Sequence, residues 1–118
     1  MAHEPTSTAR ARRLLGLIYY DGIGVSQDYT EAAKWFREAV ERTHFVARRI
    51  LGNMYADGEG VPQDFVLAHM WLNLAAAPGN IPATEYRDKV AKVMTPAMIG
   101  KAQKMAREWK PKPPAPAP

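Results

Sequence analysis

Hydrophobic residues recur at three- and four-residue spacing through most of the chain, which is the period of an amphipathic helix. Polar stretches that contain glycine and aspartate interrupt this pattern at 21–28 and at 57–64. The spacing predicts helices over about 8–20 and 45–56, and each is followed, after its polar stretch, by a second helix. The pattern therefore predicts an all-α protein.

The two helical pairs are copies of one another, displaced by 36 residues. The displacement superimposes residues of the same type in both helices and in the turn between them, which is the signature of a repeat architecture. The matched pairs include Ala11/Ala47, Arg12/Arg48, Arg13/Arg49, Leu15/Leu51, Gly16/Gly52, Tyr19/Tyr55, Asp21/Asp57, Gly22/Gly58, Gly24/Gly60, Val25/Val61, Gln27/Gln63, Asp28/Asp64, Ala32/Ala68, Trp35/Trp71 and Ala39/Ala75.

The turn residues have the chemistry that ends one helix and begins the next. Gly22 and Gly58 follow the first helix of each pair, where a residue at positive φ commonly closes a helix. Asp28 and Asp64 precede the second helices, and an aspartate there can accept hydrogen bonds from the free amides of the first turn. Asp28 with Glu31 also has the spacing of a capping box, which Asp64 lacks.

Small and aromatic residues indicate how the helices pack. Gly16 and Gly52 each cost about 1 kcal/mol of helix propensity, which is explicable where another helix must approach closely. The aromatic residues that we expect to fill the space between helices are Tyr19, Trp35, Tyr55 and Trp71.

Two further helices are predicted after Gly79. Asn80 with Pro82, and Thr95 with Pro96, have the pattern of helix starts. Apolar residues then mark one face of each helix: Ala83, Tyr86, Val90 and Val93 on the first, and Met98, Ala102, Met105, Ala106 and Trp109 on the second. This helical pair is expected to cover the end of the second repeat. The proline-rich segment 111–118 is expected to be an extended tail.

The residues of the repeat resemble a known family. The pattern Ala-x-x-x-Leu-Gly-x-x-Tyr-x-x-Gly-x-Gly-Val-x-x-Asp-x-x-x-Ala-x-x-Trp-x-x-x-Ala, at 11–39 and again at 47–75, looks like the Sel-one-like repeat, a relative of the tetratricopeptide repeat. The resemblance implies a right-handed α/α superhelical solenoid and a role as a scaffold or adaptor that binds proteins. One departure is Thr43, which stands where the family has a glycine such as Gly79.

The resemblance also fixes the expected domain organisation. A single domain over 1–110 would contain repeat one at about 8–43, repeat two at about 44–79 and C-terminal capping helices at about 82–110. Segment 111–118 lies outside it.

The resemblance to the tetratricopeptide groove implies a concave binding surface formed by the first helix of each pair. The residues expected to line it are Arg13, Leu17, Tyr20, Arg49, Asn53, Ala56, Glu85 and Lys89. Because Arg13 and Arg49 occupy equivalent positions, two guanidinium groups would stack beside Asn53 and suit a carboxylate or an extended acidic peptide. The alternative is that the arginines are solvated or paired with nearby carboxylates, those of Asp21, Asp57 or Glu85.

A second candidate surface lies at the N-terminal end of the repeats. A solenoid normally needs three or more repeats and a polar cap at both ends. Little precedes the first helix here, so Leu14 and Ile18 are expected to be exposed. We therefore predict self-association through that end, or that the chain is a fragment of a longer array.

Composition excludes several other classes. The net charge of +4 comes from basic residues that alternate with acidic ones along the chain, which argues against a nucleic-acid binder. Without cysteine there is no disulfide and no thiolate metal site. No apolar run approaches the ~20 residues that span a membrane. A cytoplasmic location is expected.

Residues that could catalyse a reaction are few. Neither Ser7 nor Ser26 begins a Ser-x-x-Lys motif, and His3, His44 and His69 lack the paired spacing of a metal-binding helix. We expect no catalytic residue, no metal and no cofactor. A small ligand-binding or hydrolytic variant of the repeat and a weak nucleic-acid binder remain as alternatives to a protein-binding scaffold.

Overall fold

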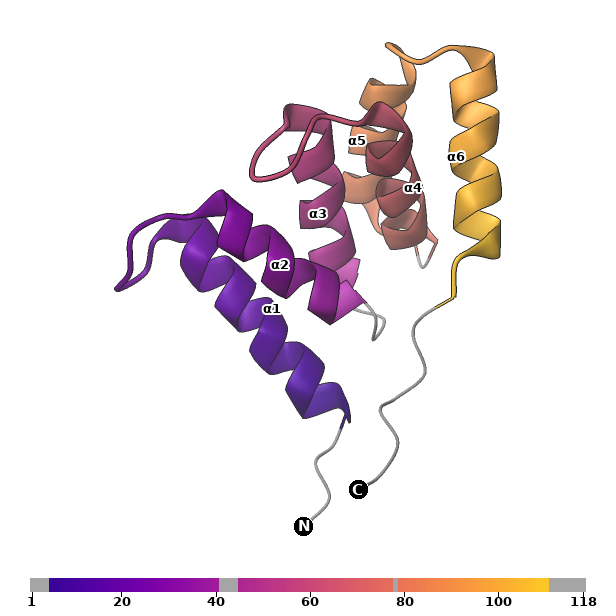
Figure 1. Ribbon diagram of the computed structural model, residues 1–118. Coiled ribbons are helices and arrows are strands. Elements are labelled where there is room, and N and C mark those ends of the chain that lie inside the picture. Colours follow the sequence, from indigo (N-terminus) through magenta and orange to yellow (C-terminus); the bar gives the residue numbers. More distant parts are fainter. Residues whose placement is uncertain (1–4, 41–44, 78, 111–118) are drawn as a thin grey trace.

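The computed structural model describes the backbone of residues 5–40, 45–77 and 79–110 and, from residue 10 on, their side chains. Within these ranges every regular element is a helix, and Figure 1 shows the helices as successive antiparallel pairs. They are α1 (Pro5–Asp21), α2 (Tyr29–Val40), α3 (Phe45–Asp57), α4 (Phe65–Ala76), α5 (Ile81–Ala91) and α6 (Pro96–Glu108). The predicted all-α repeat solenoid is therefore confirmed.

The packing of the helices differs between the repeats and the closing pair. Within each repeat the two helices pack against each other, α1 on α2 and α3 on α4, and α2 joins the repeats by packing on α3. The last two helices both pack against α4 and make little contact with each other. The C-terminal segment therefore closes the second repeat by flanking α4.

The glycines inside α1 and α3 lie at the helix crossings, as predicted. A Cβ atom on Gly16 would lie 2.7 Å from the ring of Phe36 in α2, and one on Gly52 would lie 2.8 Å from Cγ of Leu72 in α4. Because neither contact leaves room for a methyl group, the two helices of each repeat can approach this closely only with glycine there.

The turn between the helices is built in the same way in both repeats. Gly22 and Gly58 both have a φ of 69°, the left-handed conformation that glycine adopts at little cost. The side-chain amides of Gln27 and Gln63 each donate to a carbonyl at the end of the preceding helix, at 2.9 Å to Tyr20 and at 2.9 Å to Ala56. These amides satisfy acceptors that the helix ends leave free.

The aspartate caps are present, but the capping box is not. The Oδ1 atoms of Asp28 and Asp64 accept 3.0 Å hydrogen bonds from the backbone N–H groups three residues further on. The predicted return bond from Glu31 to the backbone of Asp28 is wrong. The N–H of Asp28 donates to the carbonyl of Tyr19 at 2.9 Å, and the Glu31 carboxylate lies 3.7 Å from Nζ of Lys34.

The closing helices begin where the sequence predicts. Asn80 caps α5 and Thr95 caps α6, and each cap is followed closely by a proline in the first turn. Gly79 precedes α5 with a φ of 88°. Thr43, the departure from the repeat pattern, lies outside the described residues, as do His3, His44 and the segment 111–118.

One predicted apolar face is partly wrong. In this segment Ala83 and Val90 of α5 are buried, whereas Tyr86 of α5 and Val93, just beyond the end of α5, are exposed. The contact with α4 covers only the edge of this face that carries Ala83 and Val90, so Tyr86 and Val93 remain at the surface.

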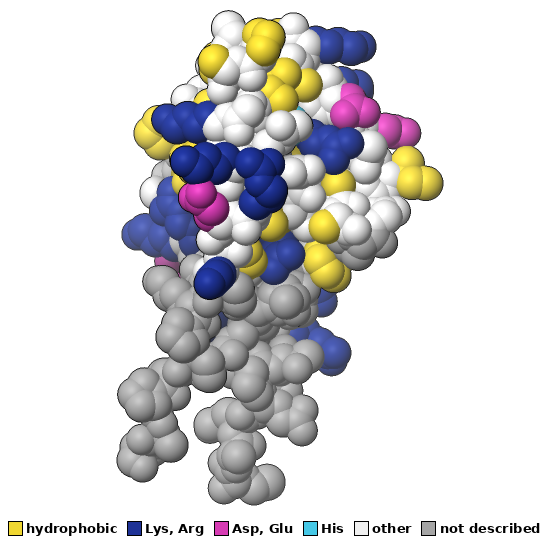
Figure 2. All heavy atoms as spheres, turned by 90° about the vertical axis from the view of Figure 1, so that its right-hand side faces the viewer, with side chains coloured by type: hydrophobic (Ala, Val, Ile, Leu, Met, Phe, Trp, Pro, Cys, Tyr) yellow, Lys and Arg dark blue, Asp and Glu magenta, His cyan; other side chains and the backbone are white. Residues whose placement is uncertain are grey.

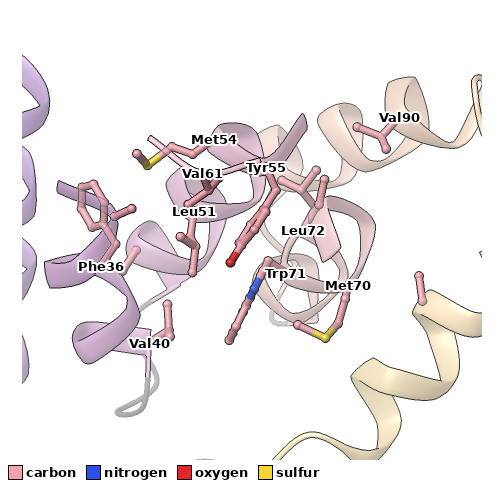
Figure 3. Packing of buried hydrophobic residues seen from close by; sticks show 14 of the residues in the cluster. Phe36, Val40, Leu51, Met54, Tyr55, Val61, Met70, Trp71, Leu72 and Val90 are labelled. Atoms are coloured by element: carbon pink, nitrogen blue, oxygen red, sulfur yellow. The ribbon is translucent and has the colours of Figure 1, made fainter. Parts of the chain in front are cut away.

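The hydrophobic core lies where the two repeats contact each other. Its largest fully buried side chains are Phe36 and Val40 of α2, Leu51 and Met54 of α3, and Leu72 of α4. Figure 3 shows Leu51 and Met54 beside the α2 residues. Burial of such side chains stabilises the fold by about 1.5–3 kcal/mol each.

The two repeated tryptophans have different surroundings. Trp71 is buried and packs edge-on against Trp109, with ring centroids 5.6 Å apart. Trp35 is only half-buried and lines a shallow surface pocket with charged residues of α1 and α2. The prediction that both fill the space between helices is therefore correct only for Trp71, because the closing segment that covers Trp71 packs on α4 and has no counterpart on α2 among the described residues.

Candidate functional site

A groove of about 440 Å³ opens beside the first helices of the repeats and α5. It lies where the end of α1, the end of α3, the start of α4 and the second half of α5 meet. The residues that line it are Tyr20, Asn53, Ala56, Asp57, Phe65, Tyr86, Lys89, Val90 and Val93. Its wall is mostly aromatic and aliphatic, with one amide, one carboxylate and one ammonium group. Such a mixture of apolar lining and a few polar groups is typical of binding sites.

Four of the residues expected to form a concave surface line this groove: Tyr20, Asn53, Ala56 and Lys89. The other four do not. Leu17 packs against the hydrophobic core, and Glu85 is exposed on α5. Arg13 and Arg49 are half-buried. Arg49 stands four residues before Asn53 on α3, so one helical turn separates it from the groove.

The phenol of Tyr20 joins the first repeat to the second. Its hydroxyl donates to Oε1 of Glu59 at 3.4 Å, and its ring packs against those of Tyr29 and Phe36, with centroids 5.0 and 6.4 Å away. Burial, and then the nearby carboxylate of Glu59, raise the pKa of Tyr20 to about 12. The phenol is therefore a neutral hydrogen-bond donor at the edge of the groove.

The far wall of the groove comes from α5 and from Val93, just beyond its end. Nζ of Lys89 lies 5.5 Å from the ring centroid of Tyr86, one helical turn away, which places a positive charge over an aromatic face. Tyr86 and Val93 are exposed although they are large and apolar. Exposed apolar residues that line a groove are candidates for contact with a partner.

Sequence reasoning missed five of the lining residues: Asp57, Phe65, Tyr86, Val90 and Val93. Asp57 was recognised only as the counterpart of Asp21 in the repeat, and Tyr86, Val90 and Val93 were predicted to share one apolar face that packs on the second repeat. The sequence carries no signal that separates the exposed Tyr86 and Val93 from the buried Ala83 and Val90, because all four lie on one helical face.

The arginines expected at the binding surface form no ion pair among the described residues. The ion pair on α1 belongs instead to Arg12, whose Nη1 lies 3.6 Å from Oε2 of Glu38 on α2. The alternative prediction was that Arg13 or Arg49 pairs with a nearby carboxylate. The ion pairs of the described residues include no such pair with Asp21, Asp57 or Glu85.

The N-terminal candidate surface is exposed in part. Leu14 is 48% exposed, and Ile18 is half-buried. Both lie on α1, away from the lining of the groove.

Positive charge gathers on the outer face of α6. Figure 2 shows lysine and arginine side chains over this side of the molecule. Lys101, Lys104 and Arg107 of α6 are exposed, as is Lys110 just beyond it, and one carboxylate, that of Glu108, lies 3.9 Å from Lys104. Their spacing of three residues places the basic side chains of α6 on one side of that helix.

Groups suited to catalysis or metal binding are scarce in the described ranges. No three His, Cys, Asp or Glu side chains there are grouped so that they could hold a metal ion. His69 is buried on α4, where desolvation and then the charge of Arg87 lower its pKa. None of the described helices is long and apolar enough to cross a membrane.

The sequence and the fold both match known proteins. The model of the Sel1 repeat matches residues 9–44 and again residues 46–80. The fold is similar to the crystal structure of c5321, a protective antigen present in uropathogenic Escherichia coli strains that displays an SLR fold, with 32% sequence identity and a TM-score of 0.81 over 85% of this chain. It is also similar to a Sel1 repeat protein from Oxalobacter formigenes, with 39% identity and a TM-score of 0.67 over 70% of this chain.

This chain spans 22% and 24% of the lengths of those two proteins. No curated protein sequence matches it. Sel1 repeat proteins generally act as scaffolds for protein–protein interaction, and their fold is typically not enzymatic. With two matches that together cover more than half of its length, this chain belongs to the Sel1 repeat family.

Proposed function

We propose that this chain is a protein-binding scaffold that holds an extended segment of a partner protein along α3, with an apolar side chain of that segment in the groove. The observation that carries the proposal is the exposure of Tyr86 and Val93 in the groove wall. Covering these side chains with a partner would remove apolar surface from water, at about 25 cal/mol for each Å² buried.

Polar groups in the groove would orient the bound segment. The amide of Asn53 can both donate to and accept from a peptide backbone, and the Tyr20 hydroxyl can accept a further hydrogen bond. Lys89 offers a positive charge at one wall, and Asp57 offers a negative charge near the end of α3. A peptide with an apolar anchor and an acidic residue directed at Lys89 would satisfy these groups.

The arginines extend the preference for acidic residues beyond the groove. Arg49 is one turn of α3 away from Asn53, and Arg13 holds the equivalent place on α1. An extended peptide spans about 3.3 Å per residue, so one anchored in the groove could reach Arg49 within two or three residues. A carboxylate there would form charge-assisted hydrogen bonds with the guanidinium group.

Selecting peptides from a displayed random library for binding to the whole chain would test the proposal. Peptides selected from a random library should combine an aromatic or aliphatic residue with Asp or Glu two or three positions away. Lys89→Glu and Arg49→Glu should each weaken binding of a selected peptide by about tenfold or more, since each replaces an attraction with a repulsion.

The matched control is Lys101→Glu, which makes the same charge change on the outer face of α6. It should leave binding unchanged, and circular dichroism should show equal helicity for all three variants. Peptides that bind Lys89→Glu and Arg49→Glu as well as the parent, or that are lost with Lys101→Glu, would rule out the groove.

A further inference from the structure

The residues that hold Trp109 in the second repeat have counterparts in the first repeat. Trp109, just beyond α6, packs edge-on against Trp71 with 5.6 Å between ring centroids, and the guanidinium carbon of Arg48 lies 4.7 Å from its ring centroid. The displacement of 36 residues relates Arg48 to Arg12 and Trp71 to Trp35. The first repeat therefore carries the same pair of residues that receives a tryptophan in the second.

Arg12 and Trp35 lie together in a shallow surface pocket of about 390 Å³, which we call the Trp35 pocket. Arg12 and Trp35 are half-buried, whereas their counterparts Arg48 and Trp71 are buried. The Trp35 pocket shares no residue with the groove. The residues that line it are Arg12, Glu31, Lys34, Trp35 and Glu38.

The closing segment accounts for the difference between the two sites. α6 packs against α4, as Figure 1 shows, and brings Trp109 onto Arg48 and Trp71. This segment has no counterpart on α2 among the described residues. The Trp35 pocket thus resembles the site of Trp109 with its tryptophan removed.

The rims of the two sites differ in charge. Where the second repeat has Met70 and Leu74, the Trp35 pocket has Lys34 and Glu38. An apolar helical face such as that of α6 would bury these two charged groups, at a cost in desolvation. The Trp35 pocket therefore suits one aromatic side chain between charged groups and does not suit a second closing helix.

A second copy of this chain is a poor source of that aromatic side chain. Its Trp109 already contacts Arg48 and Trp71, so binding elsewhere would uncover both of these residues. The other tryptophans of the chain are Trp71, which is buried, and Trp35 itself. The tryptophan that fits the pocket therefore belongs to a different protein.

The position of Arg107 indicates which charge accompanies the tryptophan. Arg107 precedes Trp109 by two residues and lines a shallow pocket together with Leu74. The counterpart of Leu74 in the first repeat is Glu38, whose side chain is 54% exposed. A segment that docks on the first repeat as 107–109 docks on the second would bring its basic residue beside this carboxylate.

From these observations we infer that the Trp35 pocket binds a tryptophan of a partner protein, with Arg12 against its ring and a basic residue two positions earlier beside Glu38. The guanidinium group of Arg12 would lose water on binding, and a cation against an indole ring contributes most when it is desolvated. The site goes beyond the proposed function because it lies outside the groove.

A nuclear magnetic resonance titration of the whole ¹⁵N-labelled chain tests the inference. The probe is a blocked peptide with the sequence of residues 101–110, which contains Arg107 and Trp109, added to about 2 mM to cover weak binding. The chain has three indole N–H groups, and each gives its own signal. The signal of Trp35 should shift and saturate, while those of Trp71 and Trp109 stay in place.

Altered peptides test the chemistry of the ligand. The peptide with Trp109→Ala should bind about tenfold or more weakly, because tryptophans that fill a pocket dominate such contacts. The peptide with Arg107→Glu should bind about threefold or more weakly, since it replaces an attraction to Glu38 with a repulsion.

Variants of the protein test the site. Arg12→Gln should weaken binding of the parent peptide by about fivefold or more, because the variant removes the cation beside the ring. The matched control is Arg10→Gln, the same change at an exposed residue of α1, which should leave the affinity unchanged. Lys89→Glu, in the groove, should not weaken binding, and circular dichroism should show equal helicity for all variants.

Three results would overturn the inference. One is loss of binding with Lys89→Glu but not with Arg12→Gln, which would place the peptide in the groove. Another is a shift of the Trp71 and Trp109 signals without that of Trp35, which would mean that the peptide replaces the closing segment. The third is that none of the three indole signals shifts.

Discussion

The guanidinium carbon of Arg48 lies 4.7 Å from the ring centroid of Trp109, and this contact fastens the end of α6 to the second repeat. Arg48 is buried, and desolvation lowers its pKa. It lies 5.3 Å from the ring of Phe45 on its own helix. Because Trp109 also packs edge-on against Trp71, a single residue just beyond α6 links the closing helix to both helices of the repeat.

Arg48 and Trp109 should stabilise the chain jointly, so replacing both should cost less than the sum of the two single losses. A double-mutant cycle with Arg48→Met and Trp109→Leu, which keeps apolar volume at both positions, should give a coupling energy of about 0.5–2 kcal/mol. Urea denaturation followed by circular dichroism measures the free energy of unfolding. Additive losses would mean that the two side chains act independently.

Equivalent glycines should respond differently to the same substitution. Gly24→Ala and Gly60→Ala both place a side chain at a φ of 72°, which costs about 1 kcal/mol. At Gly60 the methyl group would in addition overlap the backbone of Tyr29, so this variant should lose about 2 kcal/mol more. The difference in unfolding free energy between the two variants tests the contact, and equal losses would contradict it.

The sequence predicts the helices and their turns well because each repeat is specified by local chemistry. The caps at Asp28, Asp64, Asn80 and Thr95 and the helix crossings at Gly16 and Gly52 depend on residues close to one another or on a single steric requirement. Such features follow from helix periodicity and from the special conformations of a few residue types.

The candidate site was predicted only in part because it depends on where α5 comes to lie. Tyr20 and Asn53 could be assigned from the repeat, whereas Tyr86 and Val93 come from a segment that lacks the repeat pattern. Its apolar residues could be recognised, but which of them face α4 is decided by tertiary packing. The different surroundings of Trp35 and Trp71 have the same origin, since both belong to the same motif and only the second is covered by neighbouring helices.

The aspartate caps should contribute equally to stability in the two repeats. Asp28→Ala and Asp64→Ala each remove a 3.0 Å hydrogen bond to a first-turn amide, and each should lower the free energy of unfolding by about 1 kcal/mol. Asp88→Ala, which removes an exposed carboxylate on α5, is a control that should cost less than about 0.5 kcal/mol. If Asp28→Ala or Asp64→Ala lost no more unfolding free energy than Asp88→Ala, that cap would not stabilise the fold.

Acid should destabilise the fold through His69. The side chain is 4% exposed, and desolvation followed by the charge of Arg87 lowers its pKa below the ordinary value of 6.5. In the described structure its Nδ1 has no hydrogen-bond partner. Protonation of the ring is therefore less favourable in the folded chain than in the unfolded chain.

The sign of the effect follows from proton linkage. A histidine whose pKa is lower in the folded chain takes up its proton first in the unfolded chain, so protons favour unfolding as the pH falls below about 6.5. The free energy of unfolding should then decrease as the pH falls, with a slope no steeper than about 1.4 kcal/mol per pH unit, which is the limit set by one proton. Above about pH 7.5 the contribution is constant, because His69 is neutral in both states.

Comparison with His69→Gln separates this titration from the others. Both proteins share every carboxylate and the two remaining histidines, so the difference between their unfolding free energies at pH 7.5 and at pH 5.5 reports on His69 alone. The parent should lose more stability than the variant between these pH values. If the two proteins lost the same amount, the ring would be equally easy to protonate in both states, and its burial on α4 beside Arg87 would have no effect on its pKa.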